Sequence, residues 1–438
     1  MSEASTGRSI PTTTSANAPA RGFQPVTGTE RIESIDVIRG IALLGILVVN
    51  SLYFSMPMMV GMNPPGFGSE EAVTNPLEWT AWWIVMVLFQ FKFISLFSML
   101  FGVGAAIQFD RARAAGRSFD GFFSKRMVIL LGFGILHALL FWYGDILTIY
   151  AVLGFGLLIL CRLKIAPLVI LGIVFLFFSA VLSVGMFALE MLSPEFPEME
   201  GELPDTWLGV LNAAQWNPGN PIWIQGETRA YAEGPYLDLF AFRAISWLMA
   251  LISIIFTFGW HVLAMFCFGV ALLRARFFGD GGRRLRRVAI TVALPIGLLM
   301  EVGATFLKSS ALEGWPLGKG LAIVLNEFGS VILALGYAGV IVWLVRSGLL
   351  SWFARIAACT GRMALSVYLL ETIIMTSVFY HYGLGWFGQV DRIWLIPMSL
   401  FIWVLLAVFS TLWLVNYRQG PMEWLWRRLA YGRAAGRG

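Results

Sequence analysis

The sequence contains little charge and few cysteines. Only 13% of its 438 residues are charged, compared with roughly 25% in an ordinary soluble protein. Its three cysteines stand far apart, without the spacing of a metal site or a disulfide framework, so we expect free thiols and no metal. The P-loop, the dinucleotide fingerprint, HExxH and GxSxG are all missing. These absences exclude an ordinary soluble enzyme and predict no permanently bound cofactor.

Apolar residues dominate the chain instead. They make up 58% of it, and the 15% that are aromatic include 18 Trp and 35 Phe, a composition typical of a surface that faces lipid and of helix ends with interfacial anchors. Segments long enough to cross a bilayer follow one another through most of the sequence. The pattern predicts an all-α, polytopic integral membrane protein with about ten transmembrane helices, over 36–57, 81–107, 127–143, 147–161, 166–189, 244–273, 288–307, 320–345, 363–380 and 393–415.

The predicted organisation is one membrane domain with short flanking parts. Residues 1–30 are rich in Ser, Thr, Ala and Pro and contain no apolar h-region, which indicates a disordered cytoplasmic tail rather than a signal peptide. We expect the transmembrane helical domain over 31–416, with an extracytoplasmic loop at about 190–243, and a cytoplasmic C-terminal tail over 417–438. Because the loop is long and rich in Pro, Gly and Trp, we expect it to fold over the mouth of the bundle.

The basic residues gather in alternate connections. Lys and Arg lie in short clusters between apolar segments rather than along one soluble face, so the net charge of +5 does not indicate a nucleic-acid partner. Most of the 31 basic residues fall in the even-numbered turns and near the two ends, whereas residues 190–238 are acidic. Because Lys and Arg are retained on the cytoplasmic side, both termini are predicted to be cytoplasmic. The expected location is the bacterial inner membrane.

Polar side chains at membrane depth need a partner, a water-filled cavity or a function. On the first predicted helix Asp36 and Arg39 are three residues apart and can pair. Asn50, eleven residues after Arg39, lies on nearly the same face of this helix about 16 Å further along its axis. The alternative is an anchor pair with a structural Asn. On the second helix Lys92 shares a face with Ser95, and we expect it to contact a carboxylate, carbonyl groups or an anionic ligand.

The strongest local signal lies in the segment LHALLFWYGDILTIY. His137 falls in the outer half of the third predicted helix, and Asp145 follows a Gly turn at the start of the next. A carboxylate beside an imidazole can fix its tautomer and raise its basicity, which prepares it to take a proton from a hydroxyl or an amine. The alternative is a hydrogen-bonded core histidine. His261 is a weaker candidate for a catalytic base because its helix carries no acidic residue. His381 is expected in a solvated turn.

Four more ionisable residues lie in the later helices. Glu301 and Glu327 are expected in the outer halves of the seventh and eighth helices. Glu371 lies within the ninth helix, which Arg362 opens from the cytoplasmic side. These residues could line a polar cavity, or they could pair with Lys92 and with one another. Taken together they indicate a site more strongly than any single member does.

Several ordered motifs resemble one known family. They are RIESIDVIRGIALLGILVVN, FKFISLFSMLFGVGAA, LHALLFWYGDILTIYAVLG, YAEGPYLDLFAFR, GRMALSVYLLET and GPMEWLWRRLAYG. Together these motifs look like the YeiB-like family of bacterial inner-membrane proteins, long labelled a domain of unknown function. The resemblance covers nearly everything after Arg31.

The resemblance implies a fold related to transmembrane acyltransferases, among them the acyltransferase-3 proteins and the lysosomal heparan glucosaminide acetyltransferase. Those enzymes take acyl-CoA from the cytoplasm and acylate an acceptor across the membrane. Their first-helix pattern corresponds here to Asp36, Arg39 and Asn50. Asn50 stands where acyltransferase-3 proteins have a catalytic His. In this replacement the chain resembles the glucosaminide enzyme, whose catalytic His lies in the loop that follows. Residues 53–81 contain no His, which either removes catalysis or moves it to His137.

The acyltransferase hypothesis assigns a role to each group. Acyl-CoA would be a co-substrate, and Arg39 and Arg362 would bind its phosphates near the cytoplasmic mouth. His137 would act as base toward a glycan or lipid acceptor, and Asp145 would orient it. Lys92 or the asparagine of the first helix would stabilise the oxyanion.

A transporter or lipid flippase for a small or amphiphilic substrate is the alternative. Buried Lys, His and Glu residues in a helical bundle mark substrate and proton pathways equally well. Membrane lipids are expected partners under either hypothesis. The aromatic and glycine-rich helix faces would also accommodate a homodimer.

Overall fold

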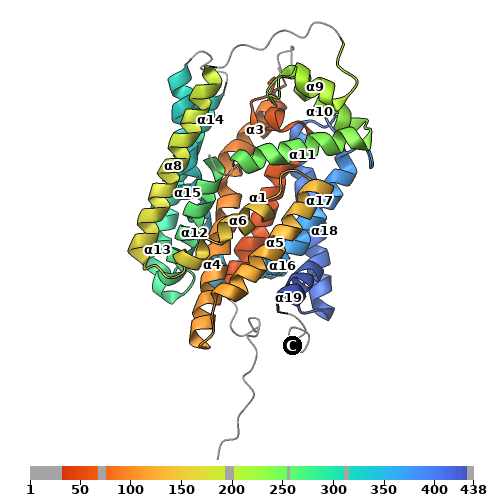
Figure 1. Cartoon of the computed structure of the whole chain (residues 1–438). Coiled ribbons are helices and arrows are strands. Elements are labelled where there is room, and N and C mark those ends of the chain that lie inside the picture. The colour runs from red at the N-terminus through yellow and green to blue at the C-terminus, as the bar shows by residue number, and fades with distance from the viewer. Residues whose placement is uncertain (1–31, 68–74, 193–201, 254–256, 310–314, 432–438) are drawn as a thin grey trace, which may run out of the picture.

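The computed structural model describes residues 32–67, 75–192, 202–253, 257–309 and 315–431. Within these ranges every regular element is a helix and no strand forms, which confirms the all-α prediction. Long helices stand side by side, and shorter helices lie across both ends of the bundle (Figure 1). The predicted tail at 1–30 lies outside the described residues.

Seven helical segments of the described chain are long and apolar enough to cross a membrane. They are α1 (Glu33–Ser55), α3 with α4 (Pro76–Leu88 and Lys92–Ala114), α5 (Asp120–Leu140), α8 (Ile165–Met191), the run of η3, α13, η4 and α14 (Asp280–Gly282, Arg283–Val288, Ala289–Ala293 and Leu294–Lys308), α15 (Pro316–Ser347) and α18 (Arg392–Asn416). An eighth arises if α16 (Ser351–Arg362) and α17 (Ala364–Phe379), bent by 84°, form one span. The chain has the helices of a multi-pass membrane protein.

The count of ten transmembrane helices is not confirmed, because two predicted spans are divided. Residues 147–161 form the short helices α6 (Leu147–Gly154) and α7 (Leu157–Leu160). Residues 244–273 are shared between α11 (Tyr236–Ser253) and α12 (Gly259–Arg274), and α12 has only 16 residues, whereas a span needs about 20. Much of α6 and α12 is buried inside the protein. Burial by protein requires apolar residues just as lipid does, so hydropathy does not distinguish the two.

The predicted loop at 190–243 is largely helical where it is described. With α2 (Met58–Met62), it forms one end of the bundle through α9 (Trp207–Ala213), α10 (Pro221–Ala232) and the start of α11 (Figure 1). Asn220 begins α10, because its side chain accepts a hydrogen bond from the Ile222 backbone N–H at 2.9 Å and proline takes the next position. The His381 N–H donates to the Tyr231 carbonyl at 2.8 Å and fastens this cap to the turn after α17.

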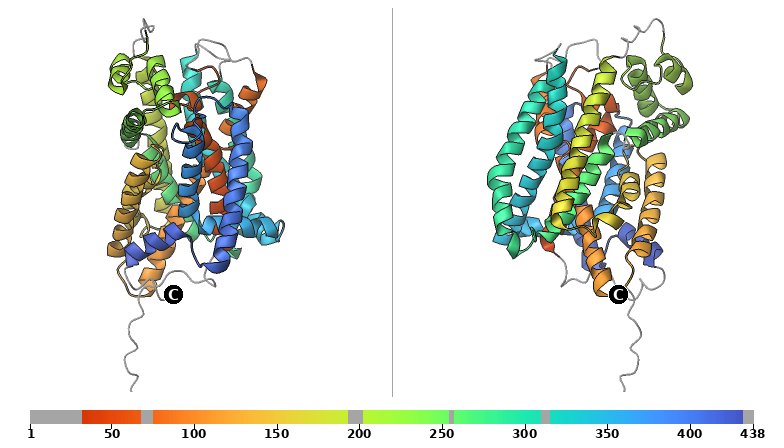
Figure 2. Two further views of the ribbon diagram at one scale, coloured as in Figure 1. Left: turned by 90° about the vertical axis from the view of Figure 1, so that its right-hand side faces the viewer. Right: turned by 60° about the vertical axis from the view of Figure 1, so that its left-hand side comes forward.

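Basic side chains mark the opposite end, which we call the arginine end. It contains α13, α16 and α19 (Pro421–Tyr431), and α19 lies across it (Figure 2). The segment predicted as a tail over 417–438 therefore contains a helix. Ile32, just before α1, and Arg427, on α19, line the same pocket, so both ends of the described chain lie here.

Glycines bring pairs of these helices into close contact. A Cβ at Gly40 of α1 would overlap the Ala357 carbonyl of α16, and one at Gly361 of α16 would overlap the Asp36 carbonyl of α1. Small residues of this kind allow the backbones of membrane helices to approach closely. The contact between α1 and α16 places Asp36 and Arg39 beside Arg362.

Replacing Gly361 by Ala should destabilise the protein by about 1–3 kcal/mol, because the added methyl group has to displace the α1 backbone. Thermal unfolding of the purified protein in detergent measures the change. Gly185→Ala on α8 is the matched control, since a Cβ there meets nothing within 4 Å. Equal melting temperatures for the two variants would contradict the close contact.

Candidate functional site

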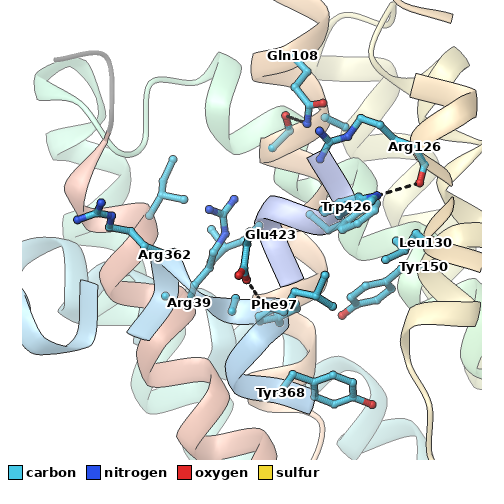
Figure 3. A pocket seen from close by; sticks show the side chains of 18 of the residues that line it. Arg39, Phe97, Gln108, Arg126, Leu130, Tyr150, Arg362, Tyr368, Glu423 and Trp426 are labelled. Carbon is cyan, nitrogen blue, oxygen red and sulfur yellow. Dashed lines mark hydrogen bonds between the residues drawn. The ribbon is translucent and has the colours of Figure 1, made fainter. Parts of the chain in front are cut away.

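A pocket of about 320 Å³ opens at the arginine end, among α1, α4, α5, α6, α16, α17 and α19 (Figure 3). Its charged lining contains five arginines and two carboxylates: Arg39, Arg111, Arg126, Arg362, Arg427, Asp36 and Glu423. The positive charges therefore outnumber the negative ones. Clustered guanidinium groups bind carboxylate and phosphate groups through charge-assisted hydrogen bonds.

Neither carboxylate cancels this surplus. Asp36 accepts one hydrogen bond from Arg39 at 3.2 Å. Glu423 instead caps the start of α17, where it accepts from the backbone N–H groups of Leu365 and Ser366 at 2.7 and 3.1 Å and from the Ser366 hydroxyl at 2.5 Å. A helix N-terminus favours a negative group, although burial raises the pKa of Glu423 above its usual value. The mouth of the pocket therefore has a surplus of positively charged side chains.

Aromatic side chains pack against Arg126 and form part of the pocket wall. The Arg126 guanidinium lies 4.1 Å from the centroid of the Trp426 ring, and the indole N–H donates to the Arg126 carbonyl at 3.2 Å (Figure 3). Deeper in the pocket the lining becomes apolar, with Phe97, Leu100 and Leu130 among it. A ligand with an anionic end and an apolar end therefore fits this gradient.

The inner end of the pocket lies beside His137. Tyr368 lines the pocket, and its ring centroid is 5.1 Å from that of the His137 ring. Ile146, which directly follows Asp145 in the chain, lines the pocket as well. The pocket thus leads from the arginines toward the histidine that the sequence analysis singled out.

His137 forms a chain of hydrogen bonds between a carboxylate and a hydroxyl. Its Nδ1 is 2.9 Å from Asp145 Oδ1, and its Nε2 is 3.0 Å from Thr372 Oγ1 on α17. The Thr148 N–H, in the first turn of α6, donates to the other Asp145 oxygen at 2.6 Å and fixes the carboxylate. With Nδ1 protonated toward Asp145, Nε2 presents a lone pair to a hydroxyl. This is the arrangement of a general base.

A second polar centre crosses the bundle on α4, α12, α14 and α15. Lys92 Nζ is 2.6 Å from Glu301 Oε2, and both side chains are fully buried. The same Lys92 nitrogen donates to the Met86 carbonyl at 2.6 Å, and the Asn326 amide donates to Glu301 at 2.9 Å. Buried charges persist in hydrocarbon only when they are paired in this way.

His261 completes the second centre. Its Nε2 is 2.7 Å from Ser95 Oγ, and its Nδ1 is 2.9 Å from Glu327 Oε1. Ser95 lies one turn from Lys92 on α4, and Glu327 follows Asn326 on α15, so the two chains of contacts share these helices. None of these residues lines the pocket. Among the described residues, no three His, Cys, Asp or Glu side chains are arranged to hold a metal ion.

Comparison with known proteins places the chain in a family. It is 32% identical over 418 residues to Uncharacterized protein YeiB of Escherichia coli (strain K12), covering 93% of this chain and 98% of that one. It is 30% identical over 414 residues to Uncharacterized protein YxaH of Bacillus subtilis (strain 168), covering 93% and 96%. The family model described as Protein of unknown function (DUF418) matches residues 272–433.

The chain belongs to the YeiB-like DUF418 family. The DUF418 match begins in α12 and includes Glu301, Glu327, Glu371 and all of α19. His137 and Lys92 precede it, in the part of the chain that the full-length relatives cover. Both polar centres of this DUF418 protein therefore join residues from the two parts.

The structure distributes the predicted site residues over three places. Asp36, Arg39 and Arg362 lie in the pocket, although Arg362 ends α16 rather than opening the next helix. Asp145 lies against His137 at the inner end. Lys92, Glu301 and Glu327 belong to the second centre.

Two predicted residues join none of these contacts. Glu371 is buried beside Thr372, and its Oε1 has no hydrogen-bond partner among the described residues. Asn50 is half-buried on α1 and does not line the pocket.

Sequence reasoning missed Thr372, Glu423 and Trp426, and it predicted Glu327 without its contact to His261. Thr372 and Glu327 lie 235 and 66 residues away in the chain from the histidines that they contact, so local spacing carries no signal for either contact. Thr372 does follow Tyr368 by one helical turn within the motif GRMALSVYLLET, which places both on one face of the helix. Glu423 and Trp426 were assigned to a tail, although GPMEWLWRRLAY has the composition of an interfacial helix.

Replacing either member of the Lys92–Glu301 pair alone should cost about 3–5 kcal/mol of stability, because the remaining charge is left buried without a partner. Lys92→Met with Glu301→Leu together should recover most of that loss. A double-mutant cycle of unfolding in detergent measures the coupling.

The matched control is the exposed pair Arg162–Asp120, whose side chains are 47% and 51% exposed. Its coupling should be no more than about 1 kcal/mol. If the buried pair coupled as weakly as the exposed one, the pairing of Lys92 with Glu301 would be disproved.

Proposed function

We propose that this protein is a membrane acyltransferase that moves an acyl group from acyl-CoA to a hydroxyl or amine acceptor. The observation that supports this most strongly is the course of the pocket, which starts among arginines and ends beside the His137 relay. Acyl-CoA has the matching order of groups, with phosphates at one end and a thioester at the other. The resemblance of the sequence to transmembrane acyltransferases leads to the same proposal.

The donor would lie along the pocket with its phosphates among the arginines. Arg39 and Arg362 would contact these phosphates, and the rings that line the deeper part would pack against the pantetheine arm. The thioester would then reach the inner end, near Tyr368.

The transfer needs one proton acceptor. His137 Nε2 would take the proton of the acceptor hydroxyl or amine as its oxygen or nitrogen forms a bond to the thioester carbonyl carbon. The carbon–sulfur bond then breaks, and the proton passes to the departing thiolate to give free CoA. Asp145, held by the Thr148 N–H, would keep the imidazole in the correct tautomer and stabilise the imidazolium.

The proposed orientation follows from the charges. We place the arginine end in the cytoplasm, since Lys and Arg accumulate on that side of membrane proteins, and acyl-CoA is found there. The cap formed by α9, α10 and the start of α11 would then face outward from the bacterial inner membrane, together with the acceptor.

His137→Gln and Asp145→Asn should each lower the rate of transfer by about 100-fold or more, because the general base or its orientation is lost. The assay measures free thiol released from acetyl-CoA or palmitoyl-CoA by protein in nanodiscs, with cell-envelope extract as the source of acceptor. Asp120→Asn, at an exposed ion pair, is the control. Thiol release that survives in folded His137→Gln would reject the proposed base.

Arg39→Gln and Arg362→Gln should each weaken the binding of CoA by about tenfold, because each removes a charge-assisted contact to phosphate. Titration calorimetry at two salt concentrations measures the affinity, which should fall as salt rises. Arg162→Gln, outside the pocket, should bind as the wild type does. The phosphate site would be ruled out if Arg162→Gln and Arg39→Gln bound CoA equally well.

A transporter or flippase is the second candidate, and the second polar centre favours it. The chain Ser95–His261–Glu327, beside the Lys92–Glu301 pair, is the kind of buried ionisable network that carries protons. This function predicts proton movement across proteoliposomes that His261→Gln abolishes, measured with an internal pH-sensitive dye. Such movement without any thiol release would favour transport, whereas thiol release unaffected by His261→Gln would favour the acyltransferase.

A further inference from the structure

Three tyrosines lie near one another at the capped end of the bundle, on the side of His137 away from the arginine end. They are Tyr143 after α5, Tyr231 on α10 and Tyr380 after α17, and none is more than 3% exposed. The rings of Tyr231 and Tyr380 meet edge to face with centroids 4.7 Å apart. Tyr143 lies within electrostatic range of Tyr380. We call these three residues the tyrosine cluster.

The hydroxyl groups of the tyrosine cluster lack protein partners. Within the described residues, the Oη atoms of all three form no hydrogen bond, and neither does the indole N–H of the neighbouring Trp142. A buried polar group without a partner is unfavourable, so native proteins rarely leave several together. Their gathering in one place indicates a site that binds polar groups.

Two ionisable side chains, Glu227 and Arg243, lie near the tyrosine cluster. Glu227 on α10 lies within electrostatic range of Tyr143 and Tyr231, and the Trp223 indole donates to its carboxyl group at 3.2 Å. Arg243 on α11 is fully buried and donates to the Phe141 carbonyl at 3.0 Å. Burial raises the pKa of Glu227 to about 7, which adds a further hydrogen-bond donor when it is protonated. Three phenol hydroxyls and one indole N–H lack partners here, so uncharged polar groups predominate and favour a neutral ligand over an ion.

The tyrosine cluster is close to the proposed base. Tyr143 follows His137 by six residues, and the backbone N–H of Trp142 donates to the His137 carbonyl at 3.1 Å. Tyr380 follows Thr372 by eight residues, which is about 12 Å along a helix. The tyrosine cluster therefore lies about two helical turns from the residue that His137 contacts.

We propose that the tyrosine cluster, with Glu227 and Arg243, binds a neutral polyhydroxylated part of the acceptor and directs one of its hydroxyl groups to His137. This assignment rests on the proposed acyltransferase function. Phenol hydroxyls both donate and accept hydrogen bonds, as sugar hydroxyls do. The ligand could be a free sugar or the sugar headgroup of a lipid, since both present the same hydroxyl groups to the site.

The test uses the full-length protein in nanodiscs and two kinds of probe. The free probes are the methyl glycosides of glucose, galactose and mannose, and the lipid probe is monoglucosyl diacylglycerol included in the nanodisc. The readouts are the saturable rise in melting temperature and native mass spectrometry of the complex. At least one probe should bind the wild type, whereas glycerol phosphate should not.

The matched variants are Tyr231→Phe and Tyr380→Phe, which remove only a hydroxyl group. Each should weaken the binding of the probe about tenfold while leaving the melting temperature of the unliganded protein unchanged or higher, since an unpartnered polar group is removed. The control is Tyr417→Phe. Tyr417 is 56% exposed and stacks on Trp413, so its replacement should alter neither the affinity for the probe nor the melting temperature. Binding only of the lipid probe would identify the acceptor as lipid-linked.

Two results would overturn the proposal. One is that no probe of either kind binds to the wild type. The other is that both Phe variants melt at lower temperature and bind as the wild type does, which would show that the hydroxyls have a structural role only. These readouts need no acyl-CoA, so probe binding without thiol release would leave the tyrosine site standing and reject the proposed transferase instead.

Discussion

Placing an ionised side chain in hydrocarbon is so unfavourable that each one has to be compensated by a neighbour, and this constraint organises the interior of the bundle. Lys92 on α4 is compensated by Glu301 on α14, and His261 on α12 is held between Ser95 and Glu327. Each of these three contacts joins residues that are at least 66 positions apart in the chain. The pairing of charge therefore fixes the positions of the helices as much as apolar packing does.

Against this background the pocket is exceptional, because its arginines outnumber its acids. The helix α4 forms a wall between the two regions. Phe97 and Leu100 face the pocket, while Lys92 and Ser95 face the second centre. Ser98, one turn from Ser95, is hydrogen-bonded at 2.8 Å to Tyr150, which lines the pocket. A movement of α4 would alter both regions at once.

The sequence predicted well what local spacing encodes. His137 and Asp145 are eight residues apart across a glycine turn, and Asp36 and Arg39 are one helical turn apart, so their contacts follow from chain geometry. The partners Thr372 and Glu327 come from helices elsewhere in the chain, and nothing in the spacing of residues identifies them. The predicted count of ten spans is not confirmed for a different reason, since α6 and α12 are short helices that are largely buried in protein.

The cap of the last helix on α17 has a consequence for the end of the chain. Glu423 is bonded to the first turn of α17, the helix that carries Tyr368 and Thr372. Removing α19 would leave the first turn of α17 without the carboxylate that accepts its backbone N–H groups. A truncated protein without α19 would therefore lack a contact that fixes the start of an interior helix.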